Sequence, residues 1–242
     1  MIDSNDKDTY DAFVSFEQIE RENFVTNALV PGSGHYQAVK PDTFYQVTGN
    51  RYAGSKTPDA VRDLWATDRE VISWMESRYG KYDIDAAASA NNAVCEKFYS
   101  EHLNCLKIWW GINNHIWLNP PYSHPDPFVK KAIEQMDNGN QIDMLLPGDN
   151  STAWFAEARR NAAEIIWIEA EITEIDQKEY CRTGRLAFIS GLTGKPVDGN
   201  NKGSVIFVMR KLQEGETQKT TYVSVSDICP GVSRKKPRKR SV

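Results

Sequence analysis

The residues with the most evident chemistry in this 242-residue chain are Asn119-Pro120-Pro121-Tyr122. They follow an apolar run, Ile116-Trp117-Leu118, and precede a polar turn and a helix start. This context places the tetrapeptide at the carboxyl end of a strand, where open α/β sheets bind their ligands. An amide, a rigid backbone and an aromatic ring are suited to hold a planar, amine-bearing base. The alternative is a proline-rich turn with a packed tyrosine.

An exocyclic amine on adenine is a poor nucleophile because its lone pair is delocalised into the ring. Two acceptors facing its hydrogens would favour a pyramidal nitrogen, and the Asn119 side-chain oxygen and the Pro120 carbonyl could supply them. Prolines fix φ and remove competing donors, and Tyr122 can stack on the base. With in-line placement against a sulfonium methyl, this pattern predicts methyl transfer to an amino nitrogen without a strong general base. A base within a duplex must be flipped out to reach such a pocket.

The elements that position this site can be predicted from local signals. Thr67-Asp68-Arg69-Glu70 fits a capping box, and apolar residues at helical spacing follow until Gly80. Short strands are expected at 82–87 and 97–99, and a longer one ends at Leu118. A second helix is expected from a cap at Asp126 to Gly139.

The alternation continues with a strand at 142–146, a helix capped by Ser151 and a strand at 164–168. Residues 186–189 and 204–209 are then expected to close the sheet as an antiparallel pair. This order predicts an α/β fold, a three-layer sandwich with a mixed sheet ending in that pair. The charged, weakly periodic segment 169–184 is either a loop that reads a substrate or a solvated helix.

Five segments together resemble the phage-type DNA N6-adenine methyltransferases, the Dam-like family, over roughly residues 60 to 210. They are Asn119–Tyr122, Tyr82–Ser89, Leu145–Pro147, Trp154-Phe155 and Gly184–Phe188. The tetrapeptide alone is shared with protein-glutamine and RNA methyltransferases. The resemblance implies a Rossmann-like fold, S-adenosylmethionine as methyl donor, and a target-base role for Asn119, Pro120, Pro121 and Tyr122.

The resemblance also implies cofactor contacts. It places Asp85, Ala86 and Ala87 beside the cofactor in a first strand-to-helix loop, although alanines stand here in place of a glycine-rich loop. Asp85 could instead be a helix cap or turn acid. Thr67 could contact the cofactor carboxylate or only cap its helix. Glu101 could bind the ribose hydroxyls or be a surface glutamate.

Composition and charge limit the class of protein to which the chain can belong. The chain is 40% hydrophobic and 26% charged, which is ordinary globular composition. Its net charge is −4, but six basic residues crowd the last positions. Without those six, 23 of the 29 basic residues remain against 33 acidic ones. The six are Arg234, Lys235, Lys236, Arg238, Lys239 and Arg240.

A basic tail on an acidic body suggests a flexible arm that contacts double-stranded DNA, although it could be a solubilising tail or a nuclear address. We expect a partly ordered extension at 1–57, the catalytic domain at 58–212 and a C-terminal segment with the tail at 213–242. No membrane span or signal peptide is evident, and four scattered cysteines are expected to be reduced thiols, so the cytoplasm is the expected location.

Other functions remain open from the sequence. The substrate could be RNA or a protein glutamine, or the chain could be a non-catalytic nucleic-acid-binding module. Cys95, His102 and Cys105 lie close in sequence, but their spacing matches no common zinc arrangement, so no metal is predicted. No pattern predicts an oligomeric state.

Overall fold

The computed structural model describes residues 65–190, 194–197, 202–229 and 238–239. All of these belong to one unit, Thr48–Val242. The expected N-terminal extension at 1–57 and most of the basic tail lie outside the described residues.

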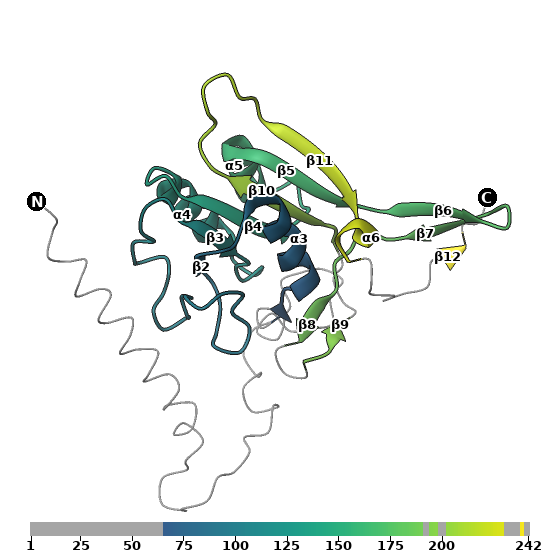
Figure 1. Ribbon diagram of the computed structural model, residues 1–242, viewed down its shortest axis with the longest axis horizontal. Coiled ribbons are helices and arrows are strands. Elements are labelled where there is room, and N and C mark those ends of the chain that lie inside the picture. Colours follow the sequence, from purple (N-terminus) through teal and green to yellow (C-terminus); the bar gives the residue numbers. More distant parts are fainter. Residues whose placement is uncertain (1–64, 191–193, 198–201, 230–237, 240–242) are drawn as a thin grey trace, which may run out of the picture. The chain divides into compact units, whose positions relative to one another are not determined.

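A six-stranded mixed sheet forms the centre of the fold, in the order β11-β5-β10-β4-β3-β2 (Figure 1). Strands β2 (Ile84–Asp85), β3 (His115–Leu118) and β4 (Gln141–Pro147) run parallel to one another. Strand β10 (Ser204–Met209) is antiparallel to both β4 and β5 (Ala162–Glu169). Strand β11 (Lys219–Ser224) is parallel to β5 at the edge.

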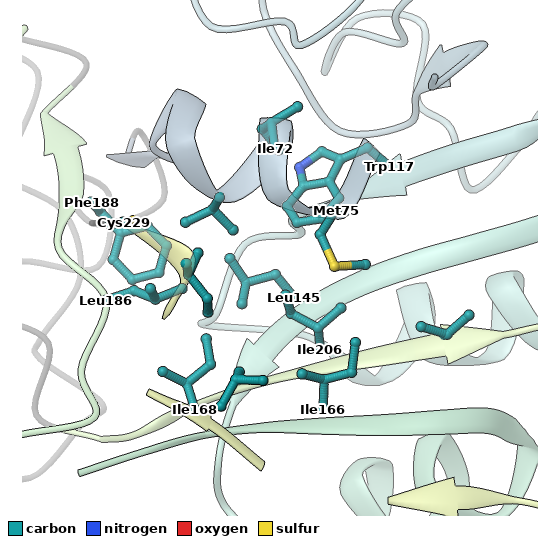
Figure 2. Close-up of a cluster of buried hydrophobic side chains, with 14 of the residues drawn as sticks. Ile72, Met75, Trp117, Leu145, Ile166, Ile168, Leu186, Phe188, Ile206 and Cys229 are labelled. Carbon is teal, nitrogen blue, oxygen red and sulfur yellow. The ribbon is translucent and has the colours of Figure 1, made fainter. Parts of the chain in front are cut away.

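Helices cover both faces of this sheet. On one face, Ile72 and Met75 of α3 (Arg69–Tyr79) pack in a buried cluster with Ile206 of β10 (Figure 2). The short helix α6 (Val225–Ile228) adds Ile228 to the same cluster. On the other face, Phe155 of α5 (Ala153–Asn161) lies 5.2 Å from Phe207, centroid to centroid, and α4 (Asp126–Met136) packs beside α5.

Neighbouring residues of a strand face opposite sides of a sheet. Ile206 meets α3 while Phe207 meets α5, so the two helices lie on opposite faces. The fold is therefore α/β with three layers and a mixed sheet, as expected from the sequence.

The helix ends differ in detail from the sequence predictions. The residue that caps α3 is Asp68, whose carboxylate accepts from the Glu70 N–H at 2.9 Å, so Thr67 is not the cap. Helix α4 begins at Asp126 with Pro125 as its cap residue, and α5 is preceded by Thr152. Ser151 does not cap α5 because its hydroxyl donates to Asp149 at 2.6 Å. Gly80 ends α3 as expected, with a φ of 98° that favours glycine.

The expected antiparallel pair of 186–189 with 204–209 is wrong. Strand β8 (Phe188–Ser190) instead pairs with β1 (Trp65–Ala66) and β9 (Pro196–Val197) in a separate small sheet. Strand β10 fills the gap between β4 and β5, and all six of its residues are buried. The strand expected at 82–87 is shorter in the structure, where it is the two-residue β2. In place of the strand expected at 97–99 there is a single parallel bridge between Phe98 and Asp85.

The segment 169–184 contains a β-hairpin rather than a solvated helix. Strands β6 (Glu171–Ile175) and β7 (Lys178–Arg182) pair around Asp176 and Gln177, whose φ values are 50° and 60°. Positive φ at both turn residues is the geometry that suits a two-residue hairpin loop. The hairpin extends away from the six-stranded sheet (Figure 1), and β12 (Arg238–Lys239) pairs with β7 as its third strand.

Candidate active site

The carboxyl ends of β2, β3 and β4 meet at one edge of the sheet because these three strands are parallel neighbours. The Ala86 N–H donates to the Trp117 carbonyl at 2.9 Å. The loop after β2, which begins at Ala86, therefore lies beside the loop after β3, which begins at Asn119. The structure thus places the candidate cofactor loop and the candidate base-binding tetrapeptide next to each other.

Asn119 has an unsatisfied amide oxygen. Its Nδ2 lies 3.5 Å from the Trp65 carbonyl, a long hydrogen bond. Its Oδ1 is buried and has no hydrogen-bond partner within the part of the chain that the structure describes. A buried polar atom without a partner costs about 1–3 kcal/mol. An acceptor left in this state is suited to receive a donor from a ligand.

Aromatic side chains lie beside the tetrapeptide. The Tyr122 ring meets Phe188 edge to face at 5.8 Å, and Trp65 stacks on Phe188 at 6.0 Å. We call Trp65, Tyr122 and Phe188 the aromatic cluster. It joins β1 and β8 to the loop after β3. Sequence reasoning did not assign Trp65 or Phe188 to the site, although Phe188 ends one of the segments that carried the family resemblance.

Thr67 lies close to Asn119 through the backbone of Trp65, two residues before it. Its Oγ1 is also buried without a hydrogen-bond partner among the described residues. The start of α3 behind it is already capped by the Asp68 carboxylate. Thr67 and Asn119 are therefore both close to the backbone of Trp65–Ala66, and each carries a buried oxygen without a partner among the described residues.

Asp85 organises the loop after β2. Its carboxylate accepts from the Ala87 N–H at 3.3 Å and the Val94 N–H at 3.1 Å. Burial raises the pKa of Asp85 to about 7, although these hydrogen bonds and the nearby Arg69 oppose the shift. Arg69 holds the far end of the loop by donating to the carbonyls of Ala93 and Val94, both at 2.7 Å. Asp85 therefore acts as a turn acid that shapes the loop, and Ala86 and Ala87 line its start.

Glu101 lies beyond the same sheet edge. The Tyr99 N–H donates to the Asp85 carbonyl at 2.8 Å, and Phe98 bridges Asp85 in parallel. The chain from 98 to 101 thus runs in the direction of β2 and carries Glu101 past its carboxyl end, where the side chain is exposed.

The loop after β4 contains an ion pair that sequence reasoning missed. Asp149 pairs with Lys202, accepts from Ser151, and has a pKa lowered mainly by the Lys202 hydrogen bond. The Gly148 N–H also donates to the Gly203 carbonyl at 2.8 Å. These contacts fix the loop after β4 to the start of β10, at the same edge as Asn119.

The remaining sequence candidates are the possible metal ligands and the basic tail. Among the described residues, no three His, Cys, Asp or Glu side chains are grouped so that they could hold a metal ion. Burial raises the pKa of both Cys95 and Cys105 to about 12, which keeps them as neutral thiols. The backbones of Arg238 and Lys239 form β12, whereas Arg234–Lys236 and Arg240 are not described. No helix of the described chain combines the length and apolar character that crossing a membrane requires.

These features define an α/β domain with an acceptor, an aromatic cluster and a shaped loop at the carboxyl edge of its parallel strands. Residues 54–231 match the family model described as DNA N-6-adenine-methyltransferase (Dam). The chain is 64% identical over 234 residues to a DNA N-6-adenine-methyltransferase of Escherichia phage T1, which covers 94% of this chain and 98% of that protein. It is 34% identical over 176 residues to the protein of the same description in Haemophilus phage HP1 (strain HP1c1), which covers 72% and 94% respectively.

The chain therefore belongs to the DNA N-6-adenine-methyltransferase (Dam) family of enzymes, and the resemblance found in its sequence is confirmed. Both relatives are phage proteins, as that resemblance implied. No solved structure matches the chain.

Proposed function

We propose that this enzyme transfers a methyl group from S-adenosylmethionine to the N6 amine of an adenine flipped out of double-stranded DNA. The observation that carries this proposal is the buried Asn119 Oδ1, which has no partner in the described chain and lies beside the loop after β2. Family membership supports adenine in DNA over the RNA and protein-glutamine alternatives.

In this proposal Asn119 and Pro120 bind the reacting amine. The Asn119 Oδ1 and the Pro120 carbonyl each accept one amine hydrogen, which concentrates lone-pair density on nitrogen in the direction of the methyl group. Because Pro120 and Pro121 restrict the backbone, the acceptors are held in place before the base arrives. Such preorganised groups stabilise the charge that develops on the nitrogen without having to reorient.

Tyr122 is proposed to stack on the flipped base. The edge-to-face contact with Phe188 fixes the orientation of the Tyr122 ring. The base can then stack on a ring that is already in position. We expect Tyr122→Ala to weaken productive base binding by about 1–3 kcal/mol, the range for base–aromatic stacking. Steady-state kinetics with a duplex substrate would show this loss as a lower kcat/KM. The Tyr122→Phe variant keeps the aromatic ring and should retain most of the kcat/KM of the unsubstituted enzyme. Unchanged kinetic constants in the alanine variant would exclude stacking.

The cofactor site is proposed to be Rossmann-like, and the residues at the carboxyl ends of β2 and β3 would hold the methyl donor. S-adenosylmethionine supplies an electrophilic methyl group on its sulfonium sulfur. Ala86 and Ala87 leave room at the end of β2, and Asp85 holds that loop in shape. Glu101 would accept from the ribose hydroxyls, a role that an acidic residue beyond the next strand takes in dinucleotide-binding sheets. Thr67 would donate its hydroxyl to the cofactor carboxylate.

Substitution of Thr67 by valine tests this last contact. Valine keeps the shape but removes Oγ1, an atom without a partner among the described residues. We expect the Kd for S-adenosylmethionine to rise about five- to tenfold, the loss of roughly one hydrogen bond, with no loss of thermal stability in the free protein. Calorimetric titration of the unsubstituted protein and of the Thr67→Val variant with S-adenosylmethionine measures the two Kd values. An unchanged Kd would leave Thr67 with no cofactor role.

The proposed reaction is tested by incubating the protein with methyl-labelled S-adenosylmethionine and equal amounts of duplex DNA, RNA and a glutamine-containing protein. Label in DNA that is recovered as N6-methyl-2′-deoxyadenosine after enzymatic digestion is the expected result. Label in RNA or protein alone would overturn the choice of substrate. Binding of DNA without any binding of S-adenosylmethionine would favour the non-catalytic module.

A further inference from the structure

The first residue of α3, Arg69, binds the loop that follows β2. Its Nη1 donates to the Val94 carbonyl and its Nη2 donates to the Ala93 carbonyl, both at 2.7 Å. The loop runs from Ala86, the residue after β2, to Val94. Both terminal nitrogens of the guanidinium group are therefore used to hold the far end of the loop that would receive the methyl donor.

The Asp85 carboxylate binds the same part of the loop. Its Oδ2 accepts from the Val94 N–H at 3.1 Å, and its Oδ1 accepts from the Ala87 N–H at 3.3 Å. The Ala93 carbonyl and the Val94 N–H belong to one peptide group. That peptide group therefore lies between a cation and a carboxylate, because its carbonyl is bound to Arg69 and its N–H is bound to Asp85.

This arrangement couples the two side chains through the peptide group. The carbonyl oxygen is the negative end of the peptide dipole and the N–H is its positive end, so the guanidinium and an ionised carboxylate polarise it in the same direction. Hydrogen bonds in such a chain strengthen one another. Loss of Arg69 is therefore expected to weaken the bond between Val94 and Asp85 as well as the two bonds that Arg69 makes itself.

The ionisation of Asp85 depends on the same contacts. Asp85 is 3% exposed, and burial raises its pKa to about 7, whereas the two backbone N–H groups and the charge of Arg69 oppose this shift. Cys95 and Cys105 also interact electrostatically with Asp85, but burial raises the pKa of both thiols to about 12, so both are neutral near pH 7. Among the described side chains that act on Asp85, Arg69 is therefore the cation that favours its ionised form.

Helix α3 gives Arg69 a fixed position. Ile72 and Met75 of this helix pack in the buried cluster that includes Trp117 of β3 (Figure 2). Thr67, whose Oγ1 is buried without a partner among the described residues, precedes Arg69 by two positions. Arg69 therefore connects the end of the loop after β2 to the helix start that carries the proposed contact with the cofactor carboxylate.

We propose that Arg69 is a positioning residue for the cofactor site, which acts through the Ala93–Val94 peptide group to keep Asp85 ionised and the loop 86–94 in the shape that receives the methyl donor. This inference rests on the proposed function in taking S-adenosylmethionine as the ligand of that loop. Arg69 contributes by fixing the loop, since both of its terminal nitrogens are bound to carbonyls. The loop is then ordered before the ligand arrives, which lowers the entropic cost of binding.

Replacement of Arg69 by methionine tests this role. Methionine keeps an unbranched side chain that suits a helix, but it removes the charge and both donors. Loss of a nearby cation raises the pKa of a carboxyl group, so less of the variant holds an ionised Asp85 at low pH. We expect the Kd for S-adenosylmethionine, measured by calorimetric titration, to rise about tenfold at about pH 6.5 and only about twofold at about pH 8.5. The readout is the ratio of the two Kd values, because titration of the ligand itself affects both proteins equally.

Two matched variants separate the charge of Arg69 from other effects. Arg69→Lys keeps the charge but loses the forked pair of donors, so its Kd ratio should stay below about threefold and be nearly the same at both pH values. Arg78, in the last turn of the same helix, pairs with Glu164 and lies over the Trp74 ring at 4.8 Å. Arg78→Met therefore removes an equal charge from α3 without changing a contact to the loop, and its Kd should match that of the unsubstituted protein.

A Kd ratio for Arg69→Met that is the same at both pH values would show that Arg69 does not act through the charge of Asp85, and an unchanged Kd would show that it does not position the site. Either result overturns the proposal and leaves the proposed function intact, because the unsubstituted protein still binds the donor. Absence of binding by the unsubstituted protein would instead refute the proposed donor itself. Arg69→Gln removes the same charge but keeps a donor, so it repeats the test should the methionine variant not fold.

Discussion

Asn119→Ala should lose about 10²–10³-fold or more in kcat, the scale seen when one preorganised hydrogen-bonding group is removed from a catalytic site. The substitution deletes Oδ1, the acceptor proposed to face one hydrogen of the adenine amine. The Pro120 carbonyl remains, but a single acceptor cannot hold both hydrogens and orient the lone pair. Single-turnover methyl transfer at saturating DNA and S-adenosylmethionine measures this loss directly.

The same substitution should leave the fold unharmed. Oδ1 has no partner among the described residues, and Nδ2 makes only a 3.5 Å contact with Trp65. Removal of a buried acceptor that lacks a partner removes a desolvation cost, so we expect an unchanged or higher Tm. Near-normal turnover would contradict the proposed chemistry. A large fall in Tm would instead show that Asn119 has a structural role, and the kinetic loss could then not be assigned to catalysis.

The local elements of this fold could be predicted from the sequence, whereas the pairing of distant strands could not. The period of Val71, Ile72 and Met75, together with Gly80, marks α3 because these signals lie within one helix. Strand β10 is buried on both faces, so its own residues carry no pattern that shows which strands flank it. Strands β4 and β5 are connected through α5 but are not neighbours in the sheet, and β10 lies between them.

The candidate site shows the same division. Asn119 could be found because its chemistry resides in a side chain after an apolar strand. Trp65 could not, because it meets Asn119 through a backbone carbonyl, which every residue possesses. For Asp85 the sequence left two roles open, and the structure shows its carboxylate bound to backbone N–H groups of the following loop. The partner of a buried carboxylate depends on the path of the loop, which local residues do not determine.

His115→Ala should have the largest effect on stability. His115 lies at the start of β3, at the opposite end of the strand from Asn119. Its Nε2 lies 2.8 Å from Asp143 Oδ2 and its Nδ1 lies 3.1 Å from the Lys81 carbonyl. Both of these neighbours are acceptors, which favours the doubly protonated, charged imidazole, whereas the Gln141 amide nitrogen 3.2 Å from Nε2 favours the neutral form. Asp143 is fully buried, and Tyr82 and Gln141 also donate to it.

Removal of one partner of a buried ion pair costs about 3–5 kcal/mol. We expect about 3 kcal/mol for His115→Ala, because Tyr82 and Gln141 still donate to Asp143. For a domain of this size that corresponds to a fall in Tm of about 6–12 °C. Denaturant unfolding measures the free energy, and methyl transfer at low temperature should remain near that of the unsubstituted enzyme.

The pH dependence of the unfolding free energy tests whether the charge of the imidazole causes this loss of stability. Burial lowers the pKa of His115, but the hydrogen bond and charge of Asp143 outweigh it, and the net pKa is raised. The folded state therefore holds the proton more tightly than the unfolded state does. The stability that His115 contributes is fully present below its unfolded pKa of about 6.5 and is lost as the pH rises through the higher folded value. The difference in unfolding free energy between the two proteins should shrink over that interval. A difference that stays constant with pH would mean that His115 stabilises the fold by packing against Tyr82, whose ring centroid lies 4.3 Å away, and not by its charge.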